Sequence, residues 1–260
     1  MRLTAVAAAV ALLSLSLMLL QISGAPAQQP DAALSPAQRK AIEEMIHAYI
    51  VAHPEVLIEA QQALGARAEA DRLARISRVL GEHRDDLYRQ RDDLVLGDPG
   101  GDVAIVEFFD YNCPYCRRIA PDLARRLAAD GHIKLILKPM PDGSPASAAV
   151  AYLAAASARQ GRFAAYHAAL LESKGQVTEA GALRLAERLS LDVARLKRDA
   201  ALPEVKTVVD RSAQLAKSLN IEGTPFFLVD ARYIAGVPDD FAEHLDRDVR
   251  EVRKTGCRLC

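Results

Sequence analysis

The fold of this chain is decided by residues 103–118, which read VAIVEFFDYNCPYCRR. The run 103–109 is apolar apart from Glu107, which is typical of a buried strand. Cys113 then begins a helix, because Pro114 suits a first helical position and apolar residues recur four apart after it, namely Ile119, Leu123 and Leu127. A second apolar run follows at 133–137. Strand, helix and strand in this order predict a parallel βαβ unit.

Cys113 and Cys116 form a C-x-x-C pair at the start of this helix. A thiolate is the nucleophile in disulfide exchange, and a thiol with the ordinary pKa of about 8.5 supplies little of it at neutral pH. The unpaired N–H groups and the positive end of the helix dipole face Cys113, so we expect its pKa to be lowered. Cys116 lies one turn further on, where it can resolve a mixed disulfide. The alternative, half of a zinc site, finds no second ligand pair nearby at a suitable spacing.

The rest of the chain completes an α/β fold around this unit. Residues 139–223 read as helices and loops, with helical patterns near 148–158, 163–171, 183–189 and 205–219. Apolar runs at 226–229 and 233–234 predict a hairpin, and Asp239 is the expected N-cap of a last helix that ends before Gly256. Together with a short strand at 94–96, this order predicts a thioredoxin fold over 94–256, with a helical domain inserted at about 139–223.

The motifs around the cysteines resemble those of a known family. Residues 107–117, EFFDYNCPYCR, and 223–227, GTPFF, are similar to the active-site strand and the cis-proline loop of the DsbA family of periplasmic thiol-disulfide oxidoreductases. The resemblance covers about 94–256. It implies a catalytic site made of Cys113, Cys116, Glu107, Pro114 and Tyr115. It also implies a substrate-binding pair in which Pro225 is cis and the Thr224 backbone is free to pair with an extended peptide.

Glu107 and Thr224 carry further hints. A carboxyl group in an apolar strand is unfavourable unless it is used, and burial would raise its pKa in the direction that proton transfer requires. The resemblance assigns Glu107 to proton handling for the buried cysteine. The alternative is a side chain that faces water, which Ile105 and Phe109 on the same face make the weaker reading. Threonine before the cis-proline is commoner among isomerase-type relatives than among strong oxidases.

Residues 28–93 form a helical extension ahead of the catalytic domain. Ser35 and Pro36 are the expected N-cap and first residue of a helix with one apolar stripe, interrupted at Pro54. The stripe consists of Ile42, Met45, Ile46, Tyr49 and Ile50. A second helix restarts at 56–64, and 67–93 is a charged extended helix with a sparse apolar seam of Leu73, Ile76, Leu80 and Leu87. The segment resembles the extension of the ScsC branch (suppressor of copper sensitivity C), and this resemblance implies a homo-oligomer, with a trimer favoured. A solvated stalk folded back on the main domain is the alternative.

Residues 1–27 are expected to be a signal peptide. Arg2 precedes an uncharged apolar stretch at 3–20, and Ala25-Pro26-Ala27 offers small residues for cleavage. An uncleaved anchor is the alternative, because 18 residues fall within the length of about 17–25 that can span a bilayer. Cleavage would place the mature protein in the periplasm, where disulfides persist.

Composition excludes several classes of protein. The 260 residues are 50% hydrophobic and carry a net charge of −1, so neither disorder nor binding to nucleic acid is expected. The four cysteines fall into two C-x-x-C pairs, too few for a disulfide-stapled scaffold.

The second pair, Cys257 and Cys260, departs from the family pattern. It can be a small disulfide that closes the C-terminus, a second redox pair that relays electrons to or from Cys113 and Cys116, or a two-thiolate Cu(I) site. The first reading is slightly favoured. The histidines lack ligand spacing, and no metal or cofactor is expected. The histidines are His47, His53, His83, His132, His167 and His244.

The favoured function is that of an exported thiol-disulfide oxidoreductase of isomerase or reductase type. Its partners would be cysteine-containing exported proteins and a membrane redox protein, either a reductase like DsbD or ScsB or an oxidase like DsbB. The alternatives are a dithiol oxidase of DsbA type and a thiol-based copper-binding protein with a part in copper tolerance.

Overall fold

The computed structural model describes residues 34–260, except for the side chains of Glu69, Arg72 and Leu73. The signal peptide expected at 1–27 and the Leu73 side chain of the predicted seam therefore lie outside the described residues. The chain divides into two compact units, one ending at Ala66 and one running from Arg67 to Cys260. No helix within residues 34–260 is long and apolar enough to cross a membrane.

The first unit consists of helix α2 (Pro36–Ala52) and the first part of α3 (Glu55–Glu82). Ser35 caps α2 as expected, because its hydroxyl accepts the Gln38 N–H and its own N–H donates to the Gln38 side chain. The helix ends just before Pro54, as predicted. None of the side chains of α2, all of which the structure describes, is buried, and the predicted apolar stripe faces outward.

The charged segment departs from its predicted course. The helix expected to restart near residue 56 and the charged helix expected over 67–93 form one continuous helix, α3, which ends at Glu82 rather than Asp93. The short helix α4 (Arg84–Tyr88) follows and turns Leu87 and Tyr88 into the core of the second unit. Burial of these two side chains explains why the long helix stops.

The second unit is built on a five-stranded sheet in the order β1-β3-β2-β4-β5. The strands are β1 (Leu94–Gly97), β2 (Val103–Phe109), β3 (Ile133–Pro139), β4 (Phe226–Val229) and β5 (Arg232–Ala235). β2 and β3 run parallel and are connected by α5 (Pro114–Asp130), whereas every other strand pair is antiparallel. The predicted βαβ unit and C-terminal hairpin are confirmed.

Alternate residues of β2 fill two separate layers. Val103, Ile105 and Phe109 join a core cluster that includes α5, the inserted helices and α11 (Phe241–Thr255). Ala104, Val106 and Phe108 join a second cluster that contains Leu80 of α3 and Leu87 of α4. β2 is therefore buried on both faces, as its continuous apolar run predicts. The predicted seam residues Leu80 and Leu87 pack on the catalytic domain.

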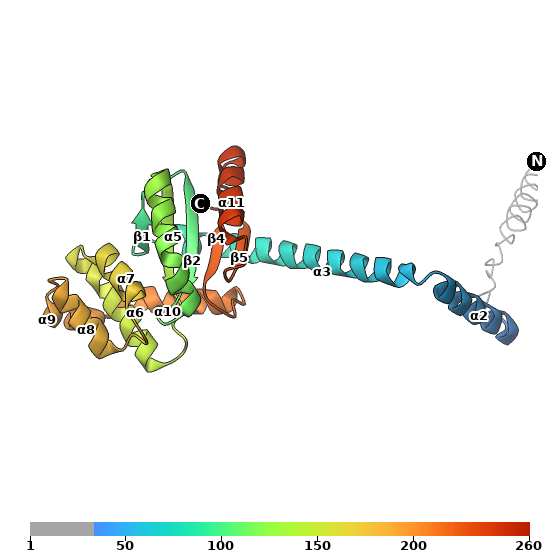
Figure 1. The fold of residues 1–260 in the computed structure, drawn as a ribbon, viewed down its shortest axis with the longest axis horizontal. Helices are drawn as coiled ribbons and strands as arrows, with labels where there is room; N and C mark the ends of the chain where they lie inside the picture. The colour runs from blue at the N-terminus through green and yellow to red at the C-terminus, as the bar shows by residue number, and fades with distance from the viewer. Residues whose placement is uncertain (1–33) are drawn as a thin grey trace, which may run out of the picture. The chain divides into compact units, whose positions relative to one another are not determined.

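The inserted helices are α6 (Pro145–Ser157), η1 (Ala158–Gln160), α7 (Phe163–Glu172), α8 (Glu179–Arg188), α9 (Val193–Ala200) and α10 (Pro203–Ser218). Helices α6 to α9 gather beside the sheet (Figure 1). The sequence reading missed α9, which is only 8 residues long and is capped by Asp192. The last turns of α10 pack in the second core cluster through Leu215, so this helix also covers the sheet. The N-cap of α11 is Asp240 rather than the expected Asp239.

Candidate functional site

Cys113 is the N-cap residue of α5, and Pro114 is the first residue of that helix. The Cys113 Sγ accepts a hydrogen bond from the backbone N–H of Cys116 at 3.4 Å. A hydrogen bond from the Cys116 thiol, together with the backbone N–H groups of Cys116 and Tyr115, lowers the pKa of Cys113 to about 5. Because Cys113 is also partly exposed, the site presents an accessible thiolate at neutral pH.

Cys116 has the opposite character. Its side chain is only 1% exposed and packs in the main core cluster. The hydrogen bond to Cys113, together with burial and the charge of Glu107, raises the pKa of Cys116 far above its ordinary value. The two thiols are therefore distinguished as an ionised outer sulfur and a protonated inner one, which is the arrangement that an attacking and a resolving thiol need.

Glu107 lies on the buried face of β2 that also carries Ile105 and Phe109. Its side chain is 5% exposed, and burial, with a smaller contribution from the charge of Cys113, raises its pKa to about 8. Glu107 also lines a cavity of about 390 Å³, together with Arg117 of α5 and His167 of α7. Glu107 is thus a buried, proton-holding group beside the cysteines, and the water-facing alternative for it is wrong.

Thr224 and Pro225 meet the cysteine pair from the other side of the fold. Their peptide bond is cis, as the resemblance implies, and the Thr224 carbonyl oxygen lies 3.2 Å from the Cys113 Sγ. When Cys113 is protonated, its thiol donates a hydrogen bond to this carbonyl. Residues 111 apart in the chain are thereby brought into contact at the reactive sulfur.

A groove of about 830 Å³ begins at this contact. Its lining includes Tyr115, Thr224 and Pro225, together with Ile76 and Val79 of α3. Tyr115 is 55% exposed, and the Arg118 guanidinium lies 5.2 Å above its ring. An extended peptide whose cysteine approaches Cys113 would run along this groove.

The sequence reading missed the residues that hold the active-site turn. The Asn112 side chain exchanges two hydrogen bonds with the backbone of Val177, at 2.7 and 3.1 Å. The Asp110 carboxylate accepts the Asn112 N–H and also a hydrogen bond from the Ser147 hydroxyl. These contacts tie the turn before Cys113 to the inserted helices. The short polar run between β2 and the cysteines was the available signal.

Two other residues near the site are held by tertiary contacts. Arg117 is half-buried and donates to the carbonyl oxygens of Leu171 and Gly175 at 3.0 and 2.6 Å. His167, one of the histidines without ligand spacing, is buried against Phe109, and its Nδ1 lies 3.0 Å from the Tyr111 hydroxyl. Burial lowers the pKa of His167 to about 3, so it is neutral.

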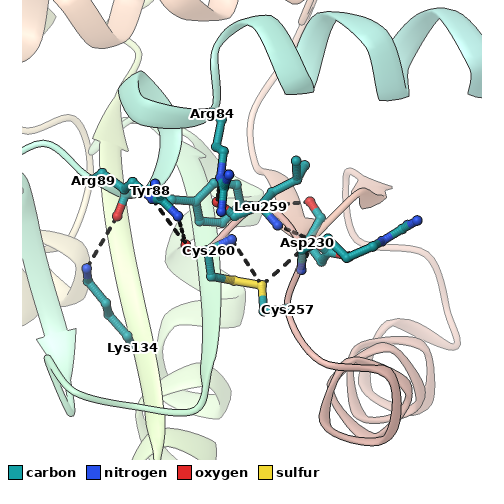
Figure 2. The surroundings of a disulfide bond; sticks show 9 residues. Arg84, Tyr88, Arg89, Lys134, Asp230, Cys257, Leu259 and Cys260 are labelled. Carbon is teal, nitrogen blue, oxygen red and sulfur yellow. Dashed lines mark hydrogen bonds and ion pairs between the residues drawn. A yellow bond between two sulfur atoms is a disulfide. The ribbon is translucent and has the colours of Figure 1, made fainter.

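Cys257 and Cys260 form a disulfide bond next to the turn between β4 and β5. Figure 2 shows this disulfide near Asp230 and Tyr88, with Arg84 of α4 and Arg89, the residue that follows α4. The first of the three sequence readings, a small disulfide at the C-terminus, describes this state. Among residues 34–260, no group of three or more potential metal-ligating side chains comes together.

In a comparison with known proteins, two family models match different parts of the chain. A family model described as thioredoxin matches residues 89–247, and one described as the copper resistance protein ScsC N-terminal domain matches residues 38–71. Among curated proteins, a Na(+)/H(+) antiporter NhaA of Salinispora tropica is 31% identical over 54% of this chain. The chain matches only 22% of the length of that relative. The thiol:disulfide interchange protein DsbA of Bordetella parapertussis is 29% identical, over 53% of this chain and 68% of the relative.

Solved structures agree with this assignment. A thioredoxin-like oxidoreductase from Silicibacter pomeroyi is 38% identical with a TM-score of 0.62, covering 66% of this chain and 98% of its own. A variant of Proteus mirabilis ScsC matches 86% of this chain and 99% of its own with a TM-score of 0.63, at 24% identity, and supports the fold.

Proposed function

Since the chain belongs to the thioredoxin family, in its DsbA-like, ScsC-type branch, we propose that it catalyses thiol-disulfide exchange on cysteine-containing exported proteins. The observation that carries the proposal is the asymmetry of the cysteine pair. Cys113 is partly exposed with a pKa of about 5, whereas Cys116 is buried with a raised pKa.

In the reductive direction, the Cys113 thiolate attacks one sulfur of a substrate disulfide and expels the other as a thiolate. A mixed disulfide between Cys113 and the substrate results. Cys116 then loses its proton and attacks the Cys113 sulfur, which releases the second substrate thiolate and leaves an internal disulfide. Glu107 interacts electrostatically with Cys116, and its pKa of about 8 leaves a minor fraction of carboxylate at neutral pH. That carboxylate accepts the proton that Cys116 must lose. The oxidative direction reverses these steps.

The direction of electron flow that we propose is isomerisation or reduction, in keeping with Thr224 before the cis-proline. The rival is dithiol oxidation of the DsbA type, and one observation favours it. A lowered pKa of Cys113 stabilises the reduced pair and so makes the disulfide form a stronger oxidant. A membrane reductase like DsbD or ScsB would serve the first activity, and an oxidase like DsbB the second.

Four measurements test the exchange reaction and its direction. Cys113→Ser should abolish reduction of insulin, whereas Cys116→Ser should trap mixed disulfides through Cys113. Refolding of scrambled ribonuclease separates isomerisation from simple oxidation. If Cys116→Ser trapped nothing and left turnover intact, the roles given to the two thiols would be wrong. The equilibrium reduction potential of the pair then decides the direction, since an isomerase must be kept reduced in its compartment.

The assembly that we propose is a periplasmic homo-oligomer, most simply a trimer, joined through α2. The stripe of α2 carries large apolar side chains in water, with Met45 at 69% and Tyr49 at 56% exposed. Burying them against copies of the same helix removes this apolar surface from water. Several copies of Cys113 around one substrate would raise their effective concentration during reshuffling.

Light scattering tests the assembly. Ile46→Glu should shift the full-length protein toward the monomer, whereas His47→Glu, which lies beside the stripe, should not. Deletion of residues 28–66 should leave a monomer that retains dithiol exchange but loses most isomerisation. A monomeric wild-type protein would remove the oligomer model and leave the isomerase assignment resting on Thr224.

A further inference from the structure

The C-terminal tail folds around a buried carboxylate. Asp230 lies at the turn between β4 and β5, has a φ of 54°, and is 1% exposed. Its Oδ1 accepts the backbone N–H groups of Arg258 and Leu259 at 3.0 and 2.8 Å. Both donors lie inside the ring that the Cys257–Cys260 disulfide closes, and Figure 2 shows Asp230 beside this disulfide.

The same ring holds the N-terminal part of this unit. The Leu259 carbonyl accepts a hydrogen bond from Arg84 Nε at 2.9 Å, and the Cys260 carbonyl accepts one from an Arg89 terminal nitrogen at 2.9 Å. Leu259 and Cys260 also pack on the second core cluster. On the other side, the Tyr88 hydroxyl donates to the Asp230 carbonyl at 2.7 Å. The closed ring thus ties α4 to the β4–β5 hairpin.

The charge near the sulfur differs between the two cysteine pairs. In both, the backbone N–H of the second cysteine points at the Sγ of the first, at 3.4 Å for Cys113 and 3.2 Å for Cys257. The Cys257 Sγ, however, lies 3.7 Å from the Asp230 Oδ1. A negative charge placed on the Cys257 sulfur would therefore lie against a buried carboxylate.

A thiolate can attack either sulfur of the tail disulfide, and both routes place a negative charge close to Asp230. A thiolate that attacks the Cys260 sulfur forms a mixed disulfide there and expels Cys257 as a thiolate beside Asp230. A thiolate that attacks the Cys257 sulfur brings its own negative charge to the same place and expels Cys260. Like charges at this separation in a region of low dielectric repel strongly. Within residues 34–260, Asp230 forms one ion pair, with the exposed guanidinium of Arg258, 3.6 Å from Oδ2.

We propose that Asp230 makes the Cys257–Cys260 disulfide resistant to thiol exchange, so that it acts as a structural clasp. The clasp would not exchange electrons with the Cys113–Cys116 pair. Complete reduction takes two electrons from a thiol reductant, forming the two tail thiols and one reductant disulfide, and the clasp slows the first attack of that reaction. The tail then keeps α4 and the hairpin joined while the active-site pair cycles. The proposal holds for either direction of electron flow at Cys113, so it can fail or succeed independently of the proposed function.

The first test follows both pairs in the full-length chain. Increasing ratios of reduced to oxidised glutathione are applied, free thiols are alkylated, and each peptide is quantified by mass spectrometry over time. The active-site pair should be reduced while the tail disulfide persists. Reduction of both pairs together would overturn the proposal and support an electron relay.

The second test isolates the charge, in a background where Cys113 and Cys116 are serine so that only the tail disulfide reacts. Its rate of reduction is measured with a cationic thiol, cysteamine, and with an anionic one, 3-mercaptopropionate. Asp230→Asn keeps an oxygen acceptor for the two N–H groups but removes the charge. It should accelerate the anionic reagent by at least about tenfold, and the cationic one less. Equal acceleration of both reagents, or none, would refute the electrostatic role.

Arg258→Ala serves as the matched variant, because Arg258 is exposed and its removal leaves the ring in place. It takes away the compensating charge, so it should slow the anionic reagent relative to the cationic one. This opposite shift remains measurable if Asp230→Asn disturbs the hairpin, and its absence would count against the proposal.

Discussion

Replacement of Glu107 by glutamine tests whether this buried carboxyl group holds a proton in the folded protein. Burial, with a smaller contribution from Cys113, raises its pKa from 4.5 to about 8. In the unfolded chain the group ionises near its ordinary pKa, so between these two values the folded state keeps a proton that the unfolded state has lost. Stability therefore falls as the pH rises through this window. Glutamine has a similar shape and does not titrate, so the fall should vanish.

The size of this change in unfolding free energy follows from the difference between the folded and unfolded pKa values of Glu107. One pKa unit corresponds to about 1.4 kcal/mol, so a rise from 4.5 to about 8 amounts to roughly 5 kcal/mol for this fully buried group. We expect Glu107→Gln and the wild type to unfold with similar free energies near pH 4.5. At pH 8 the variant should be more stable by several kcal/mol, while its exchange activity falls because the proton acceptor for Cys116 is gone.

Urea unfolding at a series of pH values measures this difference. The oxidised protein is used, because Cys113 does not titrate when it is in a disulfide. Glu172→Gln is the control: its side chain lines the same cavity as Glu107 but is exposed, so the substitution should leave the pH dependence unchanged. Parallel pH profiles for Glu107→Gln and the wild type would mean that the carboxyl group ionises in the folded protein as it does in water, and the argument for a buried proton store would fail.

Three further predictions concern the cysteines and the groove. The ultraviolet absorbance of the Cys113 thiolate should titrate near pH 5, and Cys116→Ala should move the midpoint upward, since the Cys116 thiol is the main donor to that sulfur; an unmoved midpoint would contradict this cause. Val79→Glu places a charge in the groove wall and should lower kcat/KM about tenfold for a peptide disulfide flanked by apolar residues, but not for oxidised glutathione; equal loss for both would argue against a peptide groove. Replacing Cys257 and Cys260 by serine opens a ring of residues three apart and should lower the free energy of urea unfolding by about 2 kcal/mol without abolishing insulin reduction; loss of insulin reduction would instead favour a relay.

Much of the fold was readable because its signals are local. The apolar run of β2, the proline after Cys113 and the Ser35-Pro36 start of α2 each depend on contiguous residues, and all three elements lie where the sequence predicts them. Periodicity and capping depend on residues within one or two turns of each other, so both can be recognised in the sequence. The errors occur where local signals compete with packing. The charged helix ends at Glu82 because Leu87 and Tyr88 are buried in the core of the second unit. Helix α9 is too short to show a helical period in the sequence.

The sequence by itself determined which residues could do the chemistry: a helix-capping cysteine, a second cysteine one turn on, and a carboxyl group in an apolar strand. Tertiary structure decided how they differ. Burial of Cys116 and Glu107 comes from strands and helices distant in the chain, and the Thr224 carbonyl reaches Cys113 across 111 residues. The tail disulfide owes its carboxylate neighbour to a hairpin 27 residues away. A sulfur's pKa and reactivity depend on the charges and dipoles packed within a few ångströms of it, and only the folded chain brings those groups together.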